Sequence, residues 1–99
     1  MAYSRTQATD RLMKALLSLK TEEEAYQLFD DLCTVKEVQD MAQRLEIAWM
    51  LRKGMKYQDV EAATGVSSAT ISRVNRCLNY GAGGYDLVLP RQPGREDEA

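Results

Sequence analysis

Residues 57–76 read YQDVEAATGVSSATISRVNR. Their spacing predicts a helix over residues 57–64, a break at Gly65, and a second helix that Ser67 can cap. Two short helices that meet at a steep angle need a residue tolerant of positive φ at the turn, and apolar contacts on both sides of it. The stretch therefore predicts a helix-turn-helix at about residues 57–79.

Apolar residues recur on one side of both predicted helices and are expected to face inward. They are Val60, Val66, Ile71, Val74 and Leu78. The outward residues of the second helix are small at its start and basic further along. In the major groove, small hydroxyl and methyl groups meet base edges, whereas basic side chains hold phosphates. We expect base reading by Ser67, Ser68, Ala69 and Ser72, and phosphate contacts by Lys53, Lys56, Gln58, Thr70, Arg73 and Arg76.

Basic charge is concentrated in the same part of the chain. The whole protein carries a net charge of -2, which by itself argues against a non-specific nucleic-acid coat. Between Arg52 and Tyr80, however, five Lys or Arg residues stand against Asp59 and Glu61. This stretch is a local electrostatic footprint on an acidic chain. A helical hairpin that merely completes a core is the alternative interpretation, and Glu61 favours it, because many motifs of this kind carry alanine there.

Three further helices are predicted before this motif. Residues 6–19 place leucines and alanines at helical spacing. Thr21 and Glu24 form a capping-box pattern that opens a second helix, and Thr34 with Glu37 repeats the pattern at the start of a third. The third helix ends just before the next glycine and should be the longest element. The fold class predicted from these patterns is all-α.

The third predicted helix is apolar on nearly all sides over residues 45–51. A helix of that kind must be covered on nearly all sides. Two short amphipathic helices leave little surface with which to cover it. We therefore expect a second copy of the chain to contribute, in an intertwined homodimer whose core includes Leu45, Ala48 and Trp49.

Several function classes are disfavoured by what the composition lacks. The chain has no histidine, which removes the commonest general base and most zinc, copper and iron sites. Cys33 and Cys77 each stand alone, with no second ligand nearby. We therefore expect no enzymatic activity, no metal and no cofactor. The polar N-terminal segment and the lack of a long apolar run predict a cytoplasmic protein without a membrane partner.

A longer stretch resembles a known family. Residues 35–78, VKEVQDMAQRLEIAWMLRKGMKYQDVEAATGVSSATISRVNRCL, run through the long helix and the hairpin, and residues 80–85, YGAGGY, form a glycine-rich exit. Together they are similar to the Trp repressor superfamily, and within it to the YerC/YecD-type Trp-repressor-like proteins. The resemblance extends from about Ala8 to Leu89, nearly all of the part predicted to fold.

The resemblance implies an intertwined all-α homodimer that binds double-stranded DNA as a transcriptional regulator, most often a repressor. In the Trp repressor two arginines hold the tryptophan co-repressor, and they match Arg44 and Arg73. Two neighbouring positions depart from the family's pattern, because Val74 replaces a glycine beside the indole and Cys77 replaces a serine. Arg44, Arg73 and Cys77 are thus a candidate effector pocket, but tryptophan is not expected to bind. Phosphate contact or surface ion pairing is the alternative role for the two arginines.

One helical domain is expected over residues 1–89, followed by a polar, disordered tail over residues 90–99. The leading interpretation of function is a dimeric, sequence-specific DNA-binding regulator. An alternative from another class is a protein-interaction or adaptor module that keeps the fold but docks its hairpin onto another protein. Strong salt dependence of duplex binding would favour the first interpretation.

Overall fold

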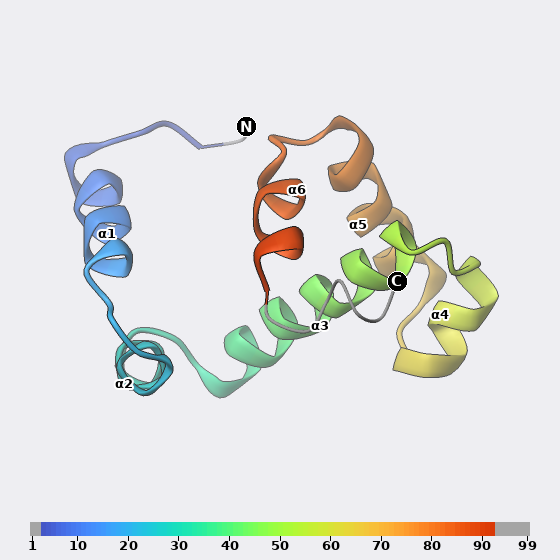
Figure 1. Ribbon diagram of the computed structural model, residues 1–99, viewed down its shortest axis with the longest axis horizontal. Coiled ribbons are helices and arrows are strands. Elements are labelled where there is room, and N and C mark those ends of the chain that lie inside the picture. The colour runs from blue at the N-terminus through green and yellow to red at the C-terminus, as the bar shows by residue number, and fades with distance from the viewer. Residues whose placement is uncertain (1–2, 93–99) are drawn as a thin grey trace. The chain divides into compact units, whose positions relative to one another are not determined.

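The computed structural model describes residues 3–92, and all regular structure within that range is helical (Figure 1). The elements are α1 (Gln7–Leu17), α2 (Glu22–Leu32), α3 (Val35–Arg52), α4 (Tyr57–Thr64), α5 (Ser68–Tyr80), α6 (Gly84–Val88) and the 3-10 turn η1 (Leu89–Arg91). The all-α prediction is confirmed. Within the same range, no helix has both the length and the apolar run that crossing a membrane requires.

The chain divides into two compact units, Met1–Gln39 and Asp40–Ala99, so that the division falls inside α3. The helix-turn-helix and the glycine-rich exit belong to the second unit. A single domain over residues 1–89 stays a prediction.

The first unit is organised by its helix caps. The Thr34 amide donates to the Glu37 carboxylate at 2.8 Å, and the Glu37 amide donates to the Thr34 hydroxyl at 3.1 Å, which confirms the predicted capping box. Hydrogen bonding of the Glu37 carboxylate by the Thr34 amide, and next by the Thr34 side chain, lowers the pKa of Glu37. At the previous helix the Glu24 amide donates to the Thr21 hydroxyl, but the Glu24 carboxylate accepts from the amide of Lys20 instead of Thr21.

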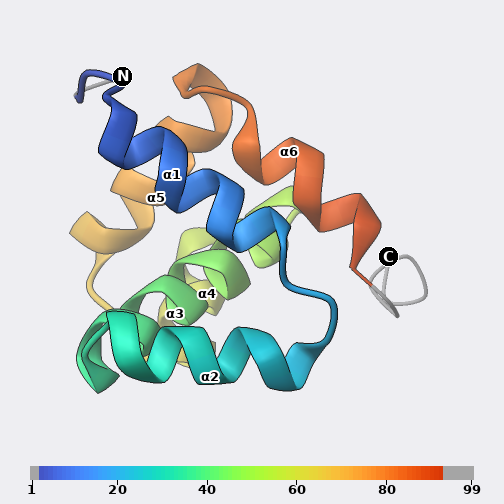
Figure 2. The same ribbon diagram turned by 90° about the vertical axis from the view of Figure 1, so that its left-hand side faces the viewer.

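The described residues 3–39 of this unit form no buried core. Helices α1 and α2 run in clearly different directions, since α1 lies in the plane of Figure 1 where α2 is seen end-on, and Figure 2 draws α2 lengthwise. None of the described residues from 3 to 39 is buried. The apolar stripes of both amphipathic helices are therefore left without full cover within this unit.

The second unit contains the hydrophobic core. Ile47 and Ala48 from α3, Val60 from α4, and Ile71, Val74 and Leu78 from α5 are buried together with Leu89. The inward positions predicted for α4 and α5 are thus confirmed, with Val66 partly buried against the same cluster.

This core corrects one prediction about dimer contacts. Ala48 is 0% exposed within a single chain, so it has no surface left to offer a partner. Leu45 and Trp49 are partly buried against the same cluster and keep some exposed surface. The apolar α3 segment is covered largely by helices of its own chain, because the sequence pattern records how much cover is needed but not which chain supplies it.

The chain returns to this core after α5. A Cβ atom on Gly81 would overlap the carbonyl oxygen of Cys77, so the exit from α5 admits only glycine without a backbone shift. Leu89 is 3% exposed and closes the core. The predicted tail needs correction at its start, because Pro90 and Arg91 lie in the turn η1, which Leu89 anchors. Gln92 follows as the C-cap of this turn, and residues 93–99 of the predicted tail lie outside the described residues.

Candidate nucleic-acid interface

The turn between α4 and α5 is built as the sequence predicts. Gly65 has φ +75°, in the left-handed region, and its amide donates to the carbonyl of Glu61 at 2.8 Å. The hydroxyl of Thr64 donates to the carbonyl of Val60 at 2.7 Å and accepts from the amide of Val66 at 3.3 Å. Thr64 was not expected to matter. A hydroxyl directly before a turn glycine is the signal that could have identified it.

The start of α5 is fixed by hydrogen bonds between Ser67 and Thr70. Ser67 is the N-cap, and its hydroxyl accepts from the Thr70 amide at 3.4 Å. The two hydroxyl oxygens lie 3.3 Å apart. Ser67 and Thr70 were predicted to contact a base and a phosphate respectively. In the structure, both take part in capping the N-terminus of α5.

Three small residues are exposed on the first half of α5: Ser68, Ala69 and Ser72. They lie at positions i, i+1 and i+4, so they share one side of the helix. The opposite side is fully buried at Ile71 and nearly so at Val74. We call Ser68, Ala69 and Ser72 the reading face, after the base-reading role that the sequence predicts for them; their side chains are small and exposed.

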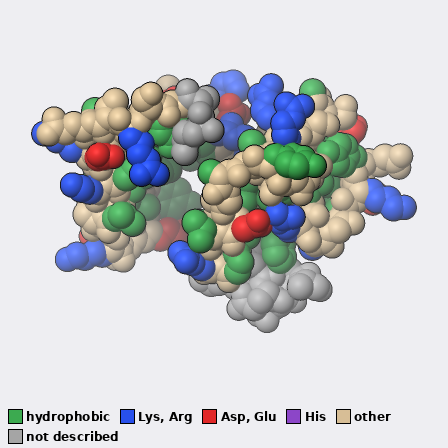
Figure 3. All heavy atoms as spheres, turned by 90° about the horizontal axis from the view of Figure 1, so that it is seen from above, with side chains coloured by type: hydrophobic (Ala, Val, Ile, Leu, Met, Phe, Trp, Pro, Cys, Tyr) green, Lys and Arg blue, Asp and Glu red, His purple; other side chains and the backbone are tan. Residues whose placement is uncertain are grey.

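The other predicted phosphate-binding side chains are exposed too. They are Lys53, Lys56, Gln58, Arg73 and Arg76, all in the second unit. Lys and Arg side chains stand out from the surface in the space-filling view (Figure 3). The Lys53 ammonium lies 5.9 Å from the centre of the Trp49 ring, a cation–π distance that restrains its long side chain.

Arg52 differs from the other cations of this stretch. Its Nε and Nη2 atoms donate to the two carboxylate oxygens of Asp86 at 2.8 and 3.0 Å. Its positive charge is thereby balanced within the unit, leaving Lys53, Lys56, Arg73 and Arg76 to supply the basic footprint. In the sequence analysis Arg52 is one of the five cations of this stretch. Its partner Asp86 lies 34 residues away, so no local pattern distinguishes Arg52 from the other four.

Of the three candidate effector residues, Cys77 lines a hollow that Arg44 and Arg73 do not line. Cys77 is exposed and lines a hollow of about 360 Å³ in the second unit. The rest of its lining is Leu45, Gly81, Ala82, Gly83, Gly84, Tyr85 and Val88. Arg44 and Arg73 are exposed but are not among these residues. Val74 is 1% exposed and belongs to the core. Its side chain therefore occupies the space beside α5 that a glycine at this position would leave empty.

Comparison with known proteins identifies the family. The chain is 54% identical over 90 residues to the uncharacterized protein YerC of Bacillus subtilis (strain 168), covering 91% of this chain and 86% of YerC. The crystal structure of a TrpR-like protein from Eubacterium eligens ATCC 27750 matches with a TM-score of 0.84 and 53% identity, over 88% of this chain and 90% of that one. A candidate Trp repressor from Staphylococcus aureus matches with a TM-score of 0.83 and 48% identity, over 88% and 87% of the two chains. The family model for the Trp repressor protein matches residues 7–93, and the chain therefore belongs to the Trp repressor family.

Proposed function

We propose that this protein is a homodimeric, sequence-specific DNA-binding transcription regulator that acts as a repressor through its helix-turn-helix. The observation that carries the proposal is the α4–α5 hairpin, whose one side is buried and whose other side combines the reading face with exposed cations. Membership of the Trp repressor family supports the same function. Such a regulator works where the DNA is, which in a bacterium is the cytoplasm.

The proposed complex has base contacts and phosphate contacts, and the two have different roles. The reading face offers two hydroxyl groups and a methyl group, which can donate to, accept from and pack against base edges in the major groove. The long cationic side chains of Lys53, Lys56, Arg73 and Arg76 reach phosphates, with Gln58 and Thr70 as neutral donors. Base contacts then decide the preferred sequence, whereas phosphate contacts decide most of the affinity and its dependence on salt.

Removal of Arg76 is expected to weaken binding to every duplex. A duplex selected from a random pool and a scrambled duplex would be titrated with wild type and Arg76→Ala at several salt concentrations. Binding releases fewer counterions from the DNA when a phosphate contact is missing. The slope of log affinity against log salt should therefore become shallower by about one for each contact removed. Ser72→Ala should instead change which sequence is selected.

The matched control is Arg11→Ala, which removes the same charge from the exposed surface of α1. It should leave the salt slope unchanged. An unaltered affinity in Arg76→Ala together with an unaltered selected sequence in Ser72→Ala would favour the adaptor-module alternative, in which the hairpin docks onto another protein.

The first unit supports the proposed homodimer. Its helices expose large apolar side chains, and soluble monomers rarely leave such residues grouped without a partner. Those of the first unit are Leu12, Met13, Leu17, Tyr26, Leu32 and Val35.

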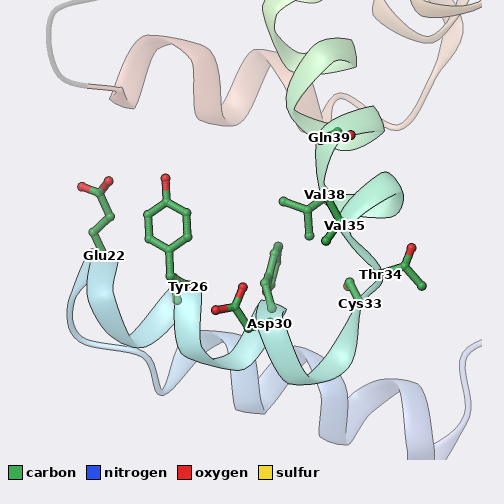
Figure 4. Close-up of a pocket in the computed structure, with 10 residues that line it drawn as sticks. Glu22, Tyr26, Asp30, Cys33, Thr34, Val35, Val38 and Gln39 are labelled. Atoms are coloured by element: carbon green, nitrogen blue, oxygen red, sulfur yellow. The ribbon is translucent and has the colours of Figure 1, made fainter.

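A groove in the same unit offers a place for the second copy. It has a volume of about 370 Å³ and lies between α2 and the first turn of α3. Figure 4 draws Tyr26 from α2 on one side of it and Val35 and Val38 from α3 on the other. Phe29 also lines it. Since no described residue of this unit is buried in one chain, apolar side chains from a second copy would complete its core.

L-Tryptophan is expected not to act on this protein. Val74 fills space with its methyl groups, and the Cys77 thiol is a poor acceptor for an ammonium group. Calorimetric titration with millimolar L-tryptophan should give no saturable heat, and duplex affinity should not change. Cys77→Ser restores a hydroxyl acceptor at an exposed position without touching the core, and it should remain equally inert. Saturable heat at micromolar tryptophan in wild type would contradict the expectation.

A further inference from the structure

One guanidinium group joins three helix ends in the second unit. Arg52 is the last residue of α3, Leu78 lies in the last turn of α5, and Asp86 lies in the first turn of α6. The Nη2 atom of Arg52 donates to the Leu78 carbonyl at 3.1 Å as well as to the Asp86 carboxylate. We call this arrangement the Arg52 clamp.

Both contacts of the clamp are electrostatically favourable at a helix end. Carbonyls in the last turn of a helix lack intrahelical N–H partners and carry partial negative charge, so a cation at the Leu78 carbonyl is favourable. A carboxylate in the first turn of α6 is favourable for the opposite reason. The planar fork of arginine can satisfy both carboxylate oxygens of Asp86 at once, which fixes direction as well as distance.

The linker between α5 and α6 explains why a clamp is needed there. Residues 81–84 read GAGG, and their largest side chain is the methyl group of Ala82. Side-chain packing within this linker therefore cannot fix how α6 leaves α5. The hydrophobic contacts of Ile71, Val74 and Leu78 hold one side of α5 but are not directional. At the C-terminal end of α5, the Arg52 clamp adds a directional restraint to this packing.

We propose that Arg52 and Asp86 are positioning residues for DNA reading: their clamp sets the orientation of α5, and hence of the reading face, without touching the DNA. This inference rests on the proposed function, because it concerns how the same hairpin discriminates between sequences. A reading surface that is held in its bound orientation loses less freedom on binding and discriminates more sharply. Because residues 81–84 have almost no side chains to fix how α6 leaves α5, DNA reading depends on the Arg52 clamp at this place.

The clamp and plain electrostatics predict opposite effects for Asp86→Asn. The substitution removes a negative charge and frees Arg52 to meet a phosphate, so electrostatics alone predicts tighter binding and a salt slope steeper by about one. Loss of orientation predicts weaker binding to the selected duplex with the slope unchanged. The side chains of Arg52 and Asp86 are 39% and 53% exposed, so solvent weakens the pair and the variant should still fold.

The test is fluorescence anisotropy on the full chain with the selected and scrambled duplexes at several salt concentrations. Asp86→Asn is expected to lose up to about fivefold in affinity for the selected duplex, because an exposed charge pair contributes no more than about that factor to an equilibrium linked to it. Arg52→Lys keeps the charge but not the fork, and it should lose as much. Affinity for the scrambled duplex should change little, so the ratio between the two duplexes falls. Asp86→Glu should recover part of the loss.

Glu61→Gln is the matched control, because it removes the same charge from an exposed position on α4 away from the clamp. It should bind at least as tightly as wild type. If Asp86→Asn binds the selected duplex as tightly as wild type or tighter, the positioning role is overturned while the proposed function stands. If wild type itself does not distinguish the selected from the scrambled duplex, the proposed function is overturned and the inference with it.

Discussion

Replacement of Ile47 by alanine is expected to lower the free energy of unfolding by about 2 to 5 kcal/mol. Ile47 is 0% exposed and belongs to the cluster that joins α3 to α4, α5 and Leu89. Removal of its outer carbons loses their burial and leaves a cavity that α4, α5 and Leu89 can close only in part. For a protein of this size the melting midpoint should fall by roughly 10 °C or more.

The measurement is thermal unfolding followed by circular dichroism, with all variants at one protein concentration because a dimer's midpoint depends on it. Ile47→Val is the matched variant, since it removes a single methylene and should cost only about 0.5 to 1.5 kcal/mol. A midpoint for Ile47→Ala within a degree or two of wild type would mean that this cluster is not the core that holds α3 to the helix-turn-helix.

Features encoded over a few residues were predictable from the sequence. The capping box of Thr34 and Glu37 needs only two side chains three positions apart, and both of its hydrogen bonds are present. Gly65 has the positive φ that a tight turn requires, and α4 spans the predicted residues. The inward positions on α5 follow from helical periodicity alone.

Features that depend on distant partners were not predictable. The apolar stretch of α3 indicated heavy cover, but the helices that cover Ala48 belong to the same chain. Arg52 looked like one cation among five until the fold placed Asp86 against it. Local patterns state what a side chain needs, whereas the tertiary structure decides which residue supplies it. The outward positions of the reading face were predictable from helical periodicity, and all three residues are exposed. Which bases they prefer was not predictable, because that preference depends on contacts with the DNA.

Phe29→Asp is expected to convert the proposed homodimer into monomers. Phe29 lines the groove between α2 and the start of α3, in a unit without a buried residue in one chain. If a second copy fills this groove, a carboxylate at position 29 is enclosed among apolar side chains with no cation to pair with, at a cost of about 3 kcal/mol or more. Such a cost raises the dimer dissociation constant at least about a hundredfold.

Sedimentation at ten micromolar should therefore give a dimer for wild type and a monomer of reduced helical content for Phe29→Asp. Gln27→Asp places the same charge on the same helix at an exposed position that does not line the groove, so it should sediment as wild type does. A dimer that persists in Phe29→Asp would move the contact to another surface. A wild-type protein that sediments as a folded monomer would contradict the proposed homodimer, because the exposed apolar side chains of α1 and α2 would then have no partner to cover them.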